Sequence, residues 1–520
     1  MIFSPNKGQN TIKARKSRKN DKFVTLQPQN HTMKSKIALL ITLALVVLTY
    51  SCKKDTQINP DSNLMLEFSA DTILFDTVFT SLGSATHHLM IYNRHSDPLK
   101  ISSVRLVKGE SSPFRLNLDG EAATELYDKV IPATDSLYSF LRVTIDPTNA
   151  NTPFVVKDEL EFITNGNTQT VKLMAWGQNA HYIVADKTII LGDTPYRYAI
   201  VADSLETTVW TNDKPYVIYG YAMINSYGTL RIEEGTRVYC HQGSGIFSWS
   251  DGQLIIDGSE ANPVIIQGDR LEANYKDLPG QWEQIILMDG RADADHRISH
   301  AIIKNALIGV NCQSSLKVTE CAMRIDNTII ENHSSYGLFS LIYPIEVKNS
   351  VIGNCGYSTF FALGGNYRFI HCTLDDHWRA STTARKTASV QVGNYQMDSD
   401  HNYYYYPFNM EMDNCIITGS LENEFVTGFD GGADSTFVFN NCLLKSNRFA
   451  NSTSGFNHCI FNEDPLFADV NNNDFHIDSI ASPVIGTGNP FYGNQIPYDL
   501  DGVSRIGIPD MGAYQYVPKN

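Results

Sequence analysis

The chain has 520 residues, 42% of them hydrophobic, and a formal net charge of −15. Residues 1–51 hold nine Lys and Arg against one acidic residue, so the rest of the chain carries −23. This acidic body argues against nucleic acid as a partner, and the length allows two or three domains.

The first 51 residues form two segments. Residues 1–32 are basic and polar without apolar periodicity, and we expect a disordered upstream extension. Residues 33–51 are predicted to be a signal peptide, because Lys34 and Lys36 precede an apolar run of twelve residues at 37–48. Twelve apolar residues are too few to span a bilayer but suit the core of a signal peptide.

Cys52 follows this segment directly. Ser51-Cys52 resembles a lipobox, although Thr49 stands where Leu or Val is usual, and the residues after Cys52 are similar to the start of many lipoproteins of the Bacteroidota. The resemblance implies lipidation of Cys52 and an outer-membrane protein that faces the periplasm or the cell surface. Polar residues 52–65 are then a tether.

Residues 66–180 consist of short alternating runs, such as 66–68, 88–92 and 171–175, that Gly, Asn, Asp and Pro separate. This texture predicts a β-sandwich. Segments such as Val143-Thr144-Ile145-Asp146-Pro147 resemble choice-of-anchor-D and Hydin-like immunoglobulin-fold domains. The resemblance implies a spacer or adhesion domain rather than an enzyme.

A repeat follows a connector at 181–215. Asn305, Asn327, Asn349 and His371 stand 22 residues apart, each between two β-rich runs. A fixed short period without helical pattern predicts stacked coils of a parallel β-helix over residues 216–516. The signature returns at Asn414, Asn441 and His458. We expect all seven residues at coil corners, with neighbouring amides bonded along the axis.

Four cysteines follow this ladder in register. Cys372, Cys415, Cys442 and Cys459 each come directly after a ladder residue. The register predicts buried free thiols stacked inside the coils, and disulfides between adjacent coils are the alternative. No two cysteines have CxxC spacing, which argues against a zinc site.

The C-terminal segment carries a second resemblance. Asp464-Pro465-Leu466-Phe467, Asp499-Leu500-Asp501-Gly502 and residues 509–514 are similar to the closing segment of many bacterial right-handed parallel β-helix proteins. Together with the ladder they imply the pectin-lyase-like fold, in an all-β chain that resembles a lipoprotein family of Bacteroidota. Gln515 stands where the pattern usually has Glu, so we expect no ion pair from Arg505 to that position.

Two insertions are predicted to bind a ligand. The loop at 268–282 mixes charges and rings, and the insertion at 380–407 carries a run of tyrosines. Sugars stack on aromatic faces while carboxylates and Arg bond their hydroxyls, and long insertions on solenoids often bind. The alternative is that both are covering loops. The candidates are Asp269, Arg270, Glu272, Tyr275, Trp282, Tyr403, Tyr404 and Tyr405.

No catalytic residue is predicted. Asp375 and Asp376 are adjacent, and neighbours in a strand point to opposite faces, so a coil corner is preferred over a hydrolytic pair. Asp499-Leu500-Asp501-Gly502 begins like a calcium loop but lacks the bidentate Glu. We expect no metal and no other cofactor, with calcium as the weaker alternative.

These features favour a cell-envelope lipoprotein that presents the β-helix to a polysaccharide or another surface protein without catalysis. The alternative is a polysaccharide lyase or glycoside hydrolase of the pectin-lyase-like fold. An enzyme is expected to show acid, base or basic groups that converge in a groove. A binding protein is expected to show aromatic and amide groups without a paired acid and base.

Overall fold

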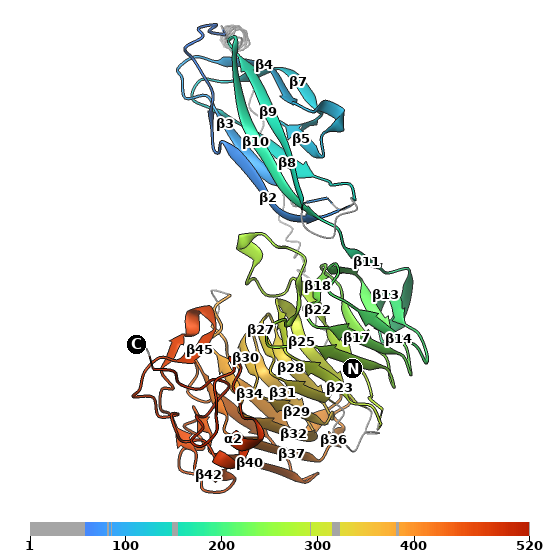
Figure 1. Ribbon diagram of the computed structural model, residues 1–520, viewed down its shortest axis with the longest axis vertical. Coiled ribbons are helices and arrows are strands. Elements are labelled where there is room, and N and C mark those ends of the chain that lie inside the picture. The colour runs from blue at the N-terminus through green and yellow to red at the C-terminus, as the bar shows by residue number, and fades with distance from the viewer. Residues whose placement is uncertain are drawn as a thin grey trace, which may run out of the picture. The chain divides into compact units, whose positions relative to one another are not determined.

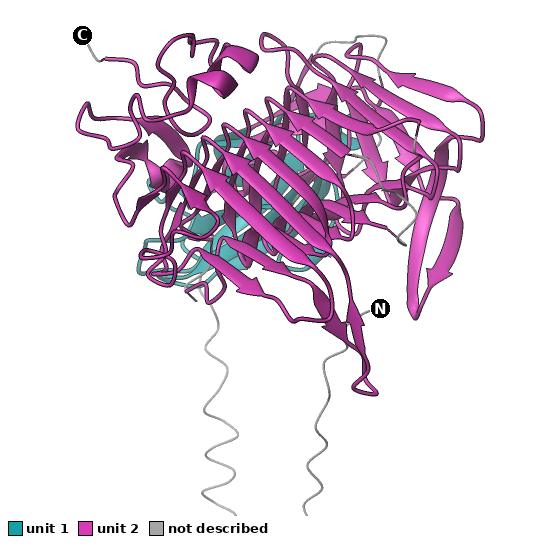
Figure 2. Cartoon of the chain, turned by 90° about the horizontal axis from the view of Figure 1, so that it is seen from below, with its two compact units in different colours: residues 1–73, 87–141, 158–172 teal, residues 74–86, 142–157, 173–520 magenta. Residues whose placement is uncertain are grey.

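The computed structural model describes residues 58–518 apart from 81–82, 85, 148–153, 292, 315–322 and 381–383. Nearly all regular structure is strand, so the predicted all-β fold is confirmed (Figure 1). Its described residues fall into two compact units, those within 1–73, 87–141 and 158–172 and those within 74–86, 142–157 and 173–520 (Figure 2). No helix in these described ranges has both the length and the apolar character that a membrane span requires. Cys52 and the predicted signal peptide lie outside them.

The strands up to residue 178 form two five-stranded sheets. In β3 (His87–Tyr92) Leu89 and Ile91 are buried between less buried neighbours, and β4 (Leu99–Leu106) alternates in the same way except at Ser103 and Val104, where the register shifts. The rings of Phe68 and Phe162 pack across the two sheets with centroids 4.8 Å apart. The predicted sandwich is therefore present, and its immunoglobulin-like character stays a prediction. One sheet orders β1 (Glu67–Phe68), β3, β8 (Ser136–Val143), β5 (Phe114–Leu118) and β6 (Glu121–Ala122); the other orders β2 (Thr72–Phe79), β10 (Asn167–Gln178), β9 (Phe154–Thr164), β4 and β7 (Glu125–Ile131).

The remaining chain winds through three long sheets, parallel except where β12 (Lys187–Leu191) pairs antiparallel with β13 (Thr194–Ala202), which is the predicted β-helix. Sheet 1 contains β11 (His181–Val184), β15 (Tyr216–Tyr219), β18 (Arg237–Cys240), β21 (Val264–Gly268), β24 (Ala301–Lys304), β27 (Ile329–His333), β30 (Val351–Cys355), β33 (Thr373–Asp376), β38 (Ile416–Gly419), β41 (Leu443–Leu444) and β43 (Ile460–Phe461). Sheet 2 contains β12 (Lys187–Leu191), β13 (Thr194–Ala202), β16 (Tyr221–Ile224), β19 (Gly245–Ser248), β22 (Trp282–Leu287), β25 (Ala306–Gln313), β28 (Tyr336–Leu341), β31 (Ser358–Leu363), β34 (Val390–Gly393) and β39 (Phe425–Gly428). Sheet 3 contains β14 (Thr207–Trp210), β17 (Thr229–Glu233), β20 (Gln253–Asp257), β23 (His296–Ser299), β26 (Met323–Asp326), β29 (Ile345–Lys348), β32 (Gly365–Ile370), β37 (Phe408–Asp413), β40 (Ser435–Asn440) and β42 (Phe456–Asn457).

Shorter elements decorate these coils. A hairpin of β35 (Tyr395–Met397) and β36 (Tyr403–Tyr405) leaves the helix after β34, and β44 (Phe467–Asp469) pairs with β45 (Asp474–Ile477) near the C-terminus. The short helix α2 (Pro490–Gln495) follows, with Asn489 as its N-cap. These late elements cover the outer face of sheet 1, where Phe475 and Tyr514 pack with Val351.

The β-helix begins earlier than the sequence indicates. β11 pairs in parallel with β15, and β14 pairs in parallel with β17, so residues 181–210 form the first coil rather than a connector. The apolar pattern of this coil is weak because it lies at the end of the stack. Val184 is 59% exposed and Ile190 is 69% exposed, so neither marks an inward face.

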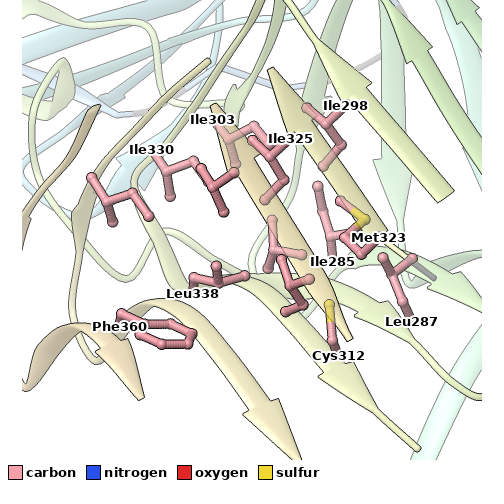
Figure 3. Packing of buried hydrophobic residues seen from close by; sticks show 14 of the residues in the cluster. Ile285, Leu287, Ile298, Ile303, Cys312, Met323, Ile325, Ile330, Leu338 and Phe360 are labelled. Carbon is pink, nitrogen blue, oxygen red and sulfur yellow. The ribbon is translucent and has the colours of Figure 1, made fainter. Parts of the chain in front are cut away.

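One continuous apolar core runs inside the coils (Figure 3). Each sheet contributes a column of inward side chains, for example Ile303 and Ile330 from sheet 1, Leu338 from sheet 2 and Ile325 from sheet 3. No coil encloses enough apolar surface by itself, and stacking on its neighbours completes the burial.

The corner ladder is confirmed for six of its seven members. Asn327, Asn349, His371, Asn414, Asn441 and His458 all have φ between 47° and 53°, the left-handed region that Asn tolerates better than most side chains. Each lies where the chain passes from sheet 3 to sheet 1. Asn349 Nδ2 donates to Asn327 Oδ1 at 2.5 Å, so the amides do bond along the axis.

Asn305 belongs to a different corner, and its predicted place is wrong. Lys304 pairs with Glu331 in sheet 1, so Asn305 aligns with Asn332, where the chain passes from sheet 1 to sheet 2. His300, with φ of 49°, occupies the place before Asn327 in the first ladder. The coil that begins at His300 is longer than the next two, so the 22-residue spacing from Asn305 to Asn327 joins two unlike corners.

The cysteine register is also confirmed. The described cysteines are free, and Cys372, Cys415 and Cys442 are buried. The Cys415 N–H donates to Cys442 Sγ at 3.3 Å, which places consecutive thiols in adjacent coils. Burial raises the pKa of the Cys415 thiol well above its usual value, so it stays protonated and inert.

We expect Asn349→Ala to lower the free energy of unfolding by roughly 2–3 kcal/mol, since it loses a buried hydrogen bond and forces a left-handed Ala. Asn349→Gly removes the same bond but accepts the conformation, so its loss is expected to be smaller by about 1 kcal/mol. Urea unfolding measures both. Equal losses in the two variants would show that the corner conformation carries no strain.

Candidate functional site

A cleft of about 800 Å³ lies where the corners between sheets 3 and 1 meet the C-terminal segment. We call it the His300 cleft. Its polar side chains come from four successive corners and from the segment that follows α2. It is lined by Ser259, Glu260, Pro263, Ser299, His300, Ala301, Ile302, Asp326, Asn327, Ile329, Lys348, Asn349, residues 495–502 and Tyr514.

The coil register builds one wall of the cleft. Ser299 pairs with Asp326, and Asp326 pairs with Lys348, in neighbouring strands of sheet 3. Parallel strands lie about 4.8 Å apart, so residues at the same register position form a column along the axis. The corner His300 follows Ser299 directly, and its N–H donates to the Asp326 carbonyl at 3.0 Å.

The C-terminal segment builds the opposite wall. Arg505 is 1% exposed, and its guanidinium donates to the carbonyls of Tyr498 (2.7 Å), Gly512 (3.1 Å) and Ala513 (2.9 Å). Burial lowers the Arg505 pKa to about 10. Main-chain carbonyls therefore accept the hydrogen bonds of Arg505 that a glutamate at position 515 would otherwise accept. The Gln515 side chain instead accepts the Asp510 N–H at 2.7 Å.

Asp499 shows why this segment is a turn rather than a calcium loop. Its Oδ1 accepts the N–H groups of Asp501 (2.9 Å) and Val503 (2.7 Å), and its Oδ2 accepts that of Gln515 (2.7 Å). A carboxylate that backbone donors occupy in this way has little capacity left for a cation. Among the described residues no group of three or more His, Cys, Asp or Glu is placed to hold a metal ion.

Two carboxylates, those of Asp326 and Glu260, line this cleft together with the His300 imidazole. Burial lowers the pKa of His300, and the charges of Asp326 and Glu260 oppose that effect. The Glu260 Oε1 lies 2.8 Å from the point that a Cβ at Gly502 would occupy. A side chain at Gly502 would therefore collide with the Glu260 carboxylate.

The two acids differ in environment. Burial raises the pKa of Asp326, against the opposing charge of Lys348. Glu260 is exposed. A carboxyl that keeps its proton to higher pH beside an exposed carboxylate is the pattern of a general acid and a general base. Tyr498, 57% exposed, adds an aromatic face at the rim.

In the predicted loop at 268–282 one candidate residue is buried and the others are partly exposed. Trp282 is 1% exposed and its indole N–H donates to the Lys304 carbonyl at 2.9 Å, so the prediction that it binds a ligand is wrong. A Trp after a Gly-rich turn starts β22 and faces the core. The other four residues lie together but are engaged. Asp269 accepts from His241 at 2.7 Å, and Arg270 pairs with Glu272 at 3.0 Å and covers the Tyr275 ring at 3.8 Å.

The tyrosine insertion is exposed as predicted for a binding surface. Tyr403 and Tyr405 lie on one face of the hairpin with Tyr395, a residue that the sequence analysis does not include. Tyr404 points to the other face, where its hydroxyl donates to Asp398 Oδ2 at 3.1 Å. The rings of Tyr395, Tyr403 and Tyr405 therefore share one surface, whereas Tyr404 lies on the opposite face and bonds to the turn.

Asp375 and Asp376 diverge, as adjacent strand residues should. Asp375 bonds His377 Nδ1 at 2.7 Å and the Thr418 hydroxyl at 2.5 Å. Asp376 faces Arg385 in the interior, with its Oδ2 3.4 Å from the Arg385 Nε. The two carboxylates thus serve different networks and do not form a hydrolytic pair.

The sequence analysis does not single out the residues that line the His300 cleft, because it considers only the corner positions of the repeat. The position before each corner is also a column: Ser299, Asp326, Lys348, Ile370 and Asp413 are in register. Most of these residues are polar and follow an inward apolar residue, which marks an outward face. Reading the repeat one residue earlier points to Asp326. Asp257 precedes Ser299 in this column, so Glu260 lies on the preceding corner, but that corner is longer than the next ones and hides the match. Tyr498 carries no such signal, because only the fold brings it to this column.

No family model matches the chain, and no curated protein matches it. A family 123 glycoside hydrolase from Clostridium perfringens is similar over 23% of this chain and 30% of its own, with 8% identity and a TM-score of 0.16. The Agl-KA catalytic domain matches over 72% and 87%, with 11% identity and a TM-score of 0.25. The catalytic domain of a GH87 alpha-1,3-glucanase matches over 77% and 91%, with 11% identity and a TM-score of 0.18. All three TM-scores lie below 0.5, so the site is argued from its own geometry.

Proposed function

We propose that this protein is a glycoside hydrolase whose active site is the His300 cleft. The observation that supports the proposal is that Glu260, His300 and Asp326 line one cleft of about 800 Å³, which has room for several sugar rings. An acid and a base that meet in a groove are the feature expected of an enzyme, and we assign these two roles to Asp326 and Glu260.

In the proposed reaction Asp326 acts as the general acid. It donates its proton to the glycosidic oxygen as the bond from that oxygen to the anomeric carbon breaks. Glu260 accepts a proton from the water that attacks the anomeric carbon, so the products are two sugar ends and no net charge change. His300 holds neither role, because burial lowers the pKa of its imidazole and favours the neutral ring, whose Nδ1 lies 2.9 Å from the Ser299 hydroxyl.

Asp326→Asn is expected to lower the rate of reducing-end release from a panel of neutral and acidic polysaccharides by about 100-fold or more, because general acid catalysis typically contributes 10²–10⁴. Glu260→Gln is expected to have a similar effect. Glu283→Gln is the matched control, since burial also raises the pKa of Glu283, but that residue lies on sheet 2 outside the cleft.

The pH profile gives a second readout. Activity should fall as pH rises through the raised pKa of Asp326, because the acid then loses its proton. Wild-type protein that binds a glycan without releasing reducing ends would support the non-catalytic alternative. Activity that survives in both cleft variants would place the chemistry elsewhere.

We also propose that Cys52 carries a lipid that anchors the protein in the outer membrane, and that the β-sandwich at 66–180 is an immunoglobulin-like spacer. The lipobox resemblance supports the anchor. Cys52→Ala should abolish incorporation of labelled palmitate and release the protein from the membrane fraction. Retention of label in the variant would refute lipidation at this residue.

A further inference from the structure

We propose that the β35–β36 hairpin is a separate capture surface for a neutral polysaccharide chain. This inference deepens the proposed function, because the polysaccharide that enters the His300 cleft would also bind at this second, non-catalytic surface. It rests on the proposed function only for the class of ligand. The surface is formed by Tyr395, Met397, Tyr403 and Tyr405.

These residues share one face of the hairpin by register. Tyr395 pairs with Tyr405 and Met397 pairs with Tyr403 in an antiparallel ladder, and alternate residues point to the same side. The three ring centroids are 5.9, 6.2 and 6.2 Å apart, and the Tyr403 and Tyr405 planes differ by 17°. The rings therefore form a nearly equilateral patch that is as wide as one or two pyranose rings.

The patch is open to solvent. Tyr395, Tyr403 and Tyr405 are 38%, 53% and 37% exposed, and Met397 is 45% exposed. Most large apolar side chains of the described residues lie in the core, so four together on an exposed two-stranded hairpin mark a surface that can bind a ligand. Tyrosine suits a sugar because its face accepts the apolar C–H side of the ring while its hydroxyl bonds the rim.

The hairpin is held rigid at both ends. At the turn, Asp398 Oδ1 accepts the N–H groups of Asp400 and Asn402, each at 2.9 Å. At the base, the Tyr406 N–H donates to the Asn394 carbonyl at 2.8 Å, and the Asn394 amide donates to the Asp430 carbonyl at 2.7 Å. A surface ordered before binding loses little conformational entropy when the ligand arrives.

Charge selects among glycans. Asp398 and Asp400 lie in the turn, and Asp430 and Asp434 lie in the segment that the Asn394 side chain holds beside the hairpin base. Residues 395–405 of the hairpin contain no Lys or Arg, so the imidazole of His401 is their one side chain that can carry a positive charge. Carboxylates near the rings repel uronates and sulfated sugars, so the surface fits a neutral chain.

Affinity electrophoresis of the full-length protein in detergent tests the proposal. Gels contain laminarin, xyloglucan or soluble starch, with polygalacturonate as the anionic comparator. We expect retardation by at least one neutral glycan and none by polygalacturonate. The Tyr395→Ala, Tyr403→Ala and Tyr405→Ala triple variant should lose at least tenfold in affinity. Tyr404→Phe, on the opposite face, should bind as the wild type does.

Three further variants keep the outcomes separate. Tyr403→Phe retains the ring and should retain most of the affinity, whereas Tyr403→Ala should lose it several-fold, so a folding defect in the triple variant cannot decide the result. Glu283→Gln, on β22 outside both the hairpin and the His300 cleft, should bind as the wild type does. Absence of retardation by every neutral glycan, a preference for polygalacturonate, or a wild-type dimer that the triple variant dissociates in light scattering would each overturn the proposal.

Discussion

Arg385→Met should lower the free energy of unfolding of the β-helix by roughly 3–5 kcal/mol, the usual cost of leaving a buried charge without its partner. The side chains of Arg385, Asp376 and Glu424 are all 0% exposed. Arg385 Nη2 lies 2.6 Å from Glu424 Oε1, and its Nε lies 3.4 Å from Asp376 Oδ2. Removing the guanidinium leaves two carboxylates in the interior.

The remaining bonds of this triad explain why the loss should be large. Glu424 also accepts the N–H groups of Ser389 (2.8 Å) and Leu421 (2.7 Å), and Asp376 accepts that of Cys355 at 3.0 Å. These backbone donors fix the carboxylates in place, so neither can turn to solvent when the arginine is lost. Urea unfolding with an intact native baseline measures the effect.

The matched control is Arg324→Met. Arg324 pairs with Asp295 at 2.7 Å, but its side chain is 45% exposed, so the variant should lose less than about 1 kcal/mol. Burial already raises the Asp376 pKa well above its usual value. The Arg385 variant should therefore recover stability relative to wild type as pH falls from 8 to 5, because protonation neutralises the Asp376 carboxyl that has lost its partner. Similar losses in the two variants would contradict the triad argument.

The corner ladder shows what could be predicted from sequence. Asn is common in left-handed turns, so Asn327 and Asn349 signal a recurring corner without any tertiary information. The same signal fails at Asn305, because two kinds of corner use the same residue type and only strand pairing separates them. His300 is missed for the complementary reason, since an Asn-centred pattern passes over the histidine that substitutes for it.

The candidate site is harder to predict from the sequence than the corner ladder, for a physical reason. Asp326 and Lys348 come together through a periodic register that a sequence does contain. Tyr498 joins them only because the C-terminal segment folds back over the corners. Glu260 lies on the preceding corner, between β20 and β21, where six residues separate the two strands and hide the repeat. Trp282 gives the opposite error, because an aromatic residue in a polar loop looks available for a ligand until a backbone carbonyl satisfies its indole.

Acid should destabilise the β-helix through two buried histidines. Burial lowers the pKa of His296 to about 4 and that of His333 to about 3. Each imidazole accepts a backbone N–H at Nδ1, from Leu254 at 2.9 Å and from Ala306 at 3.2 Å, so each must stay neutral in the fold. The unfolded chain takes up these protons near pH 6.5 and the folded chain does not.

The direction of the pH effect on stability follows from this difference in proton binding. As pH falls from 6.5 toward 4 or 3, the unfolded state binds more protons, so the free energy of unfolding decreases. At 1.36 kcal/mol per pKa unit, the loss is on the order of 3 kcal/mol for His296 and 5 kcal/mol for His333. Asp413 acts in the opposite sense, because burial raises its pKa to about 6 and protonation then favours the fold between pH 6 and 4.

A variant comparison isolates the histidines from such carboxyls. His296→Asn and His333→Asn keep a side-chain acceptor for the backbone N–H but cannot titrate, so each should be less stable than wild type at pH 7. Their deficit should shrink, or reverse, by a few kcal/mol between pH 7 and pH 4. His401→Asn, at an exposed position with φ of 65° that Asn accepts, should show no such change. Parallel stability profiles for all three variants and the wild type would mean that neither buried imidazole controls acid unfolding, and the carboxyls around Asp413 would then be the groups to replace.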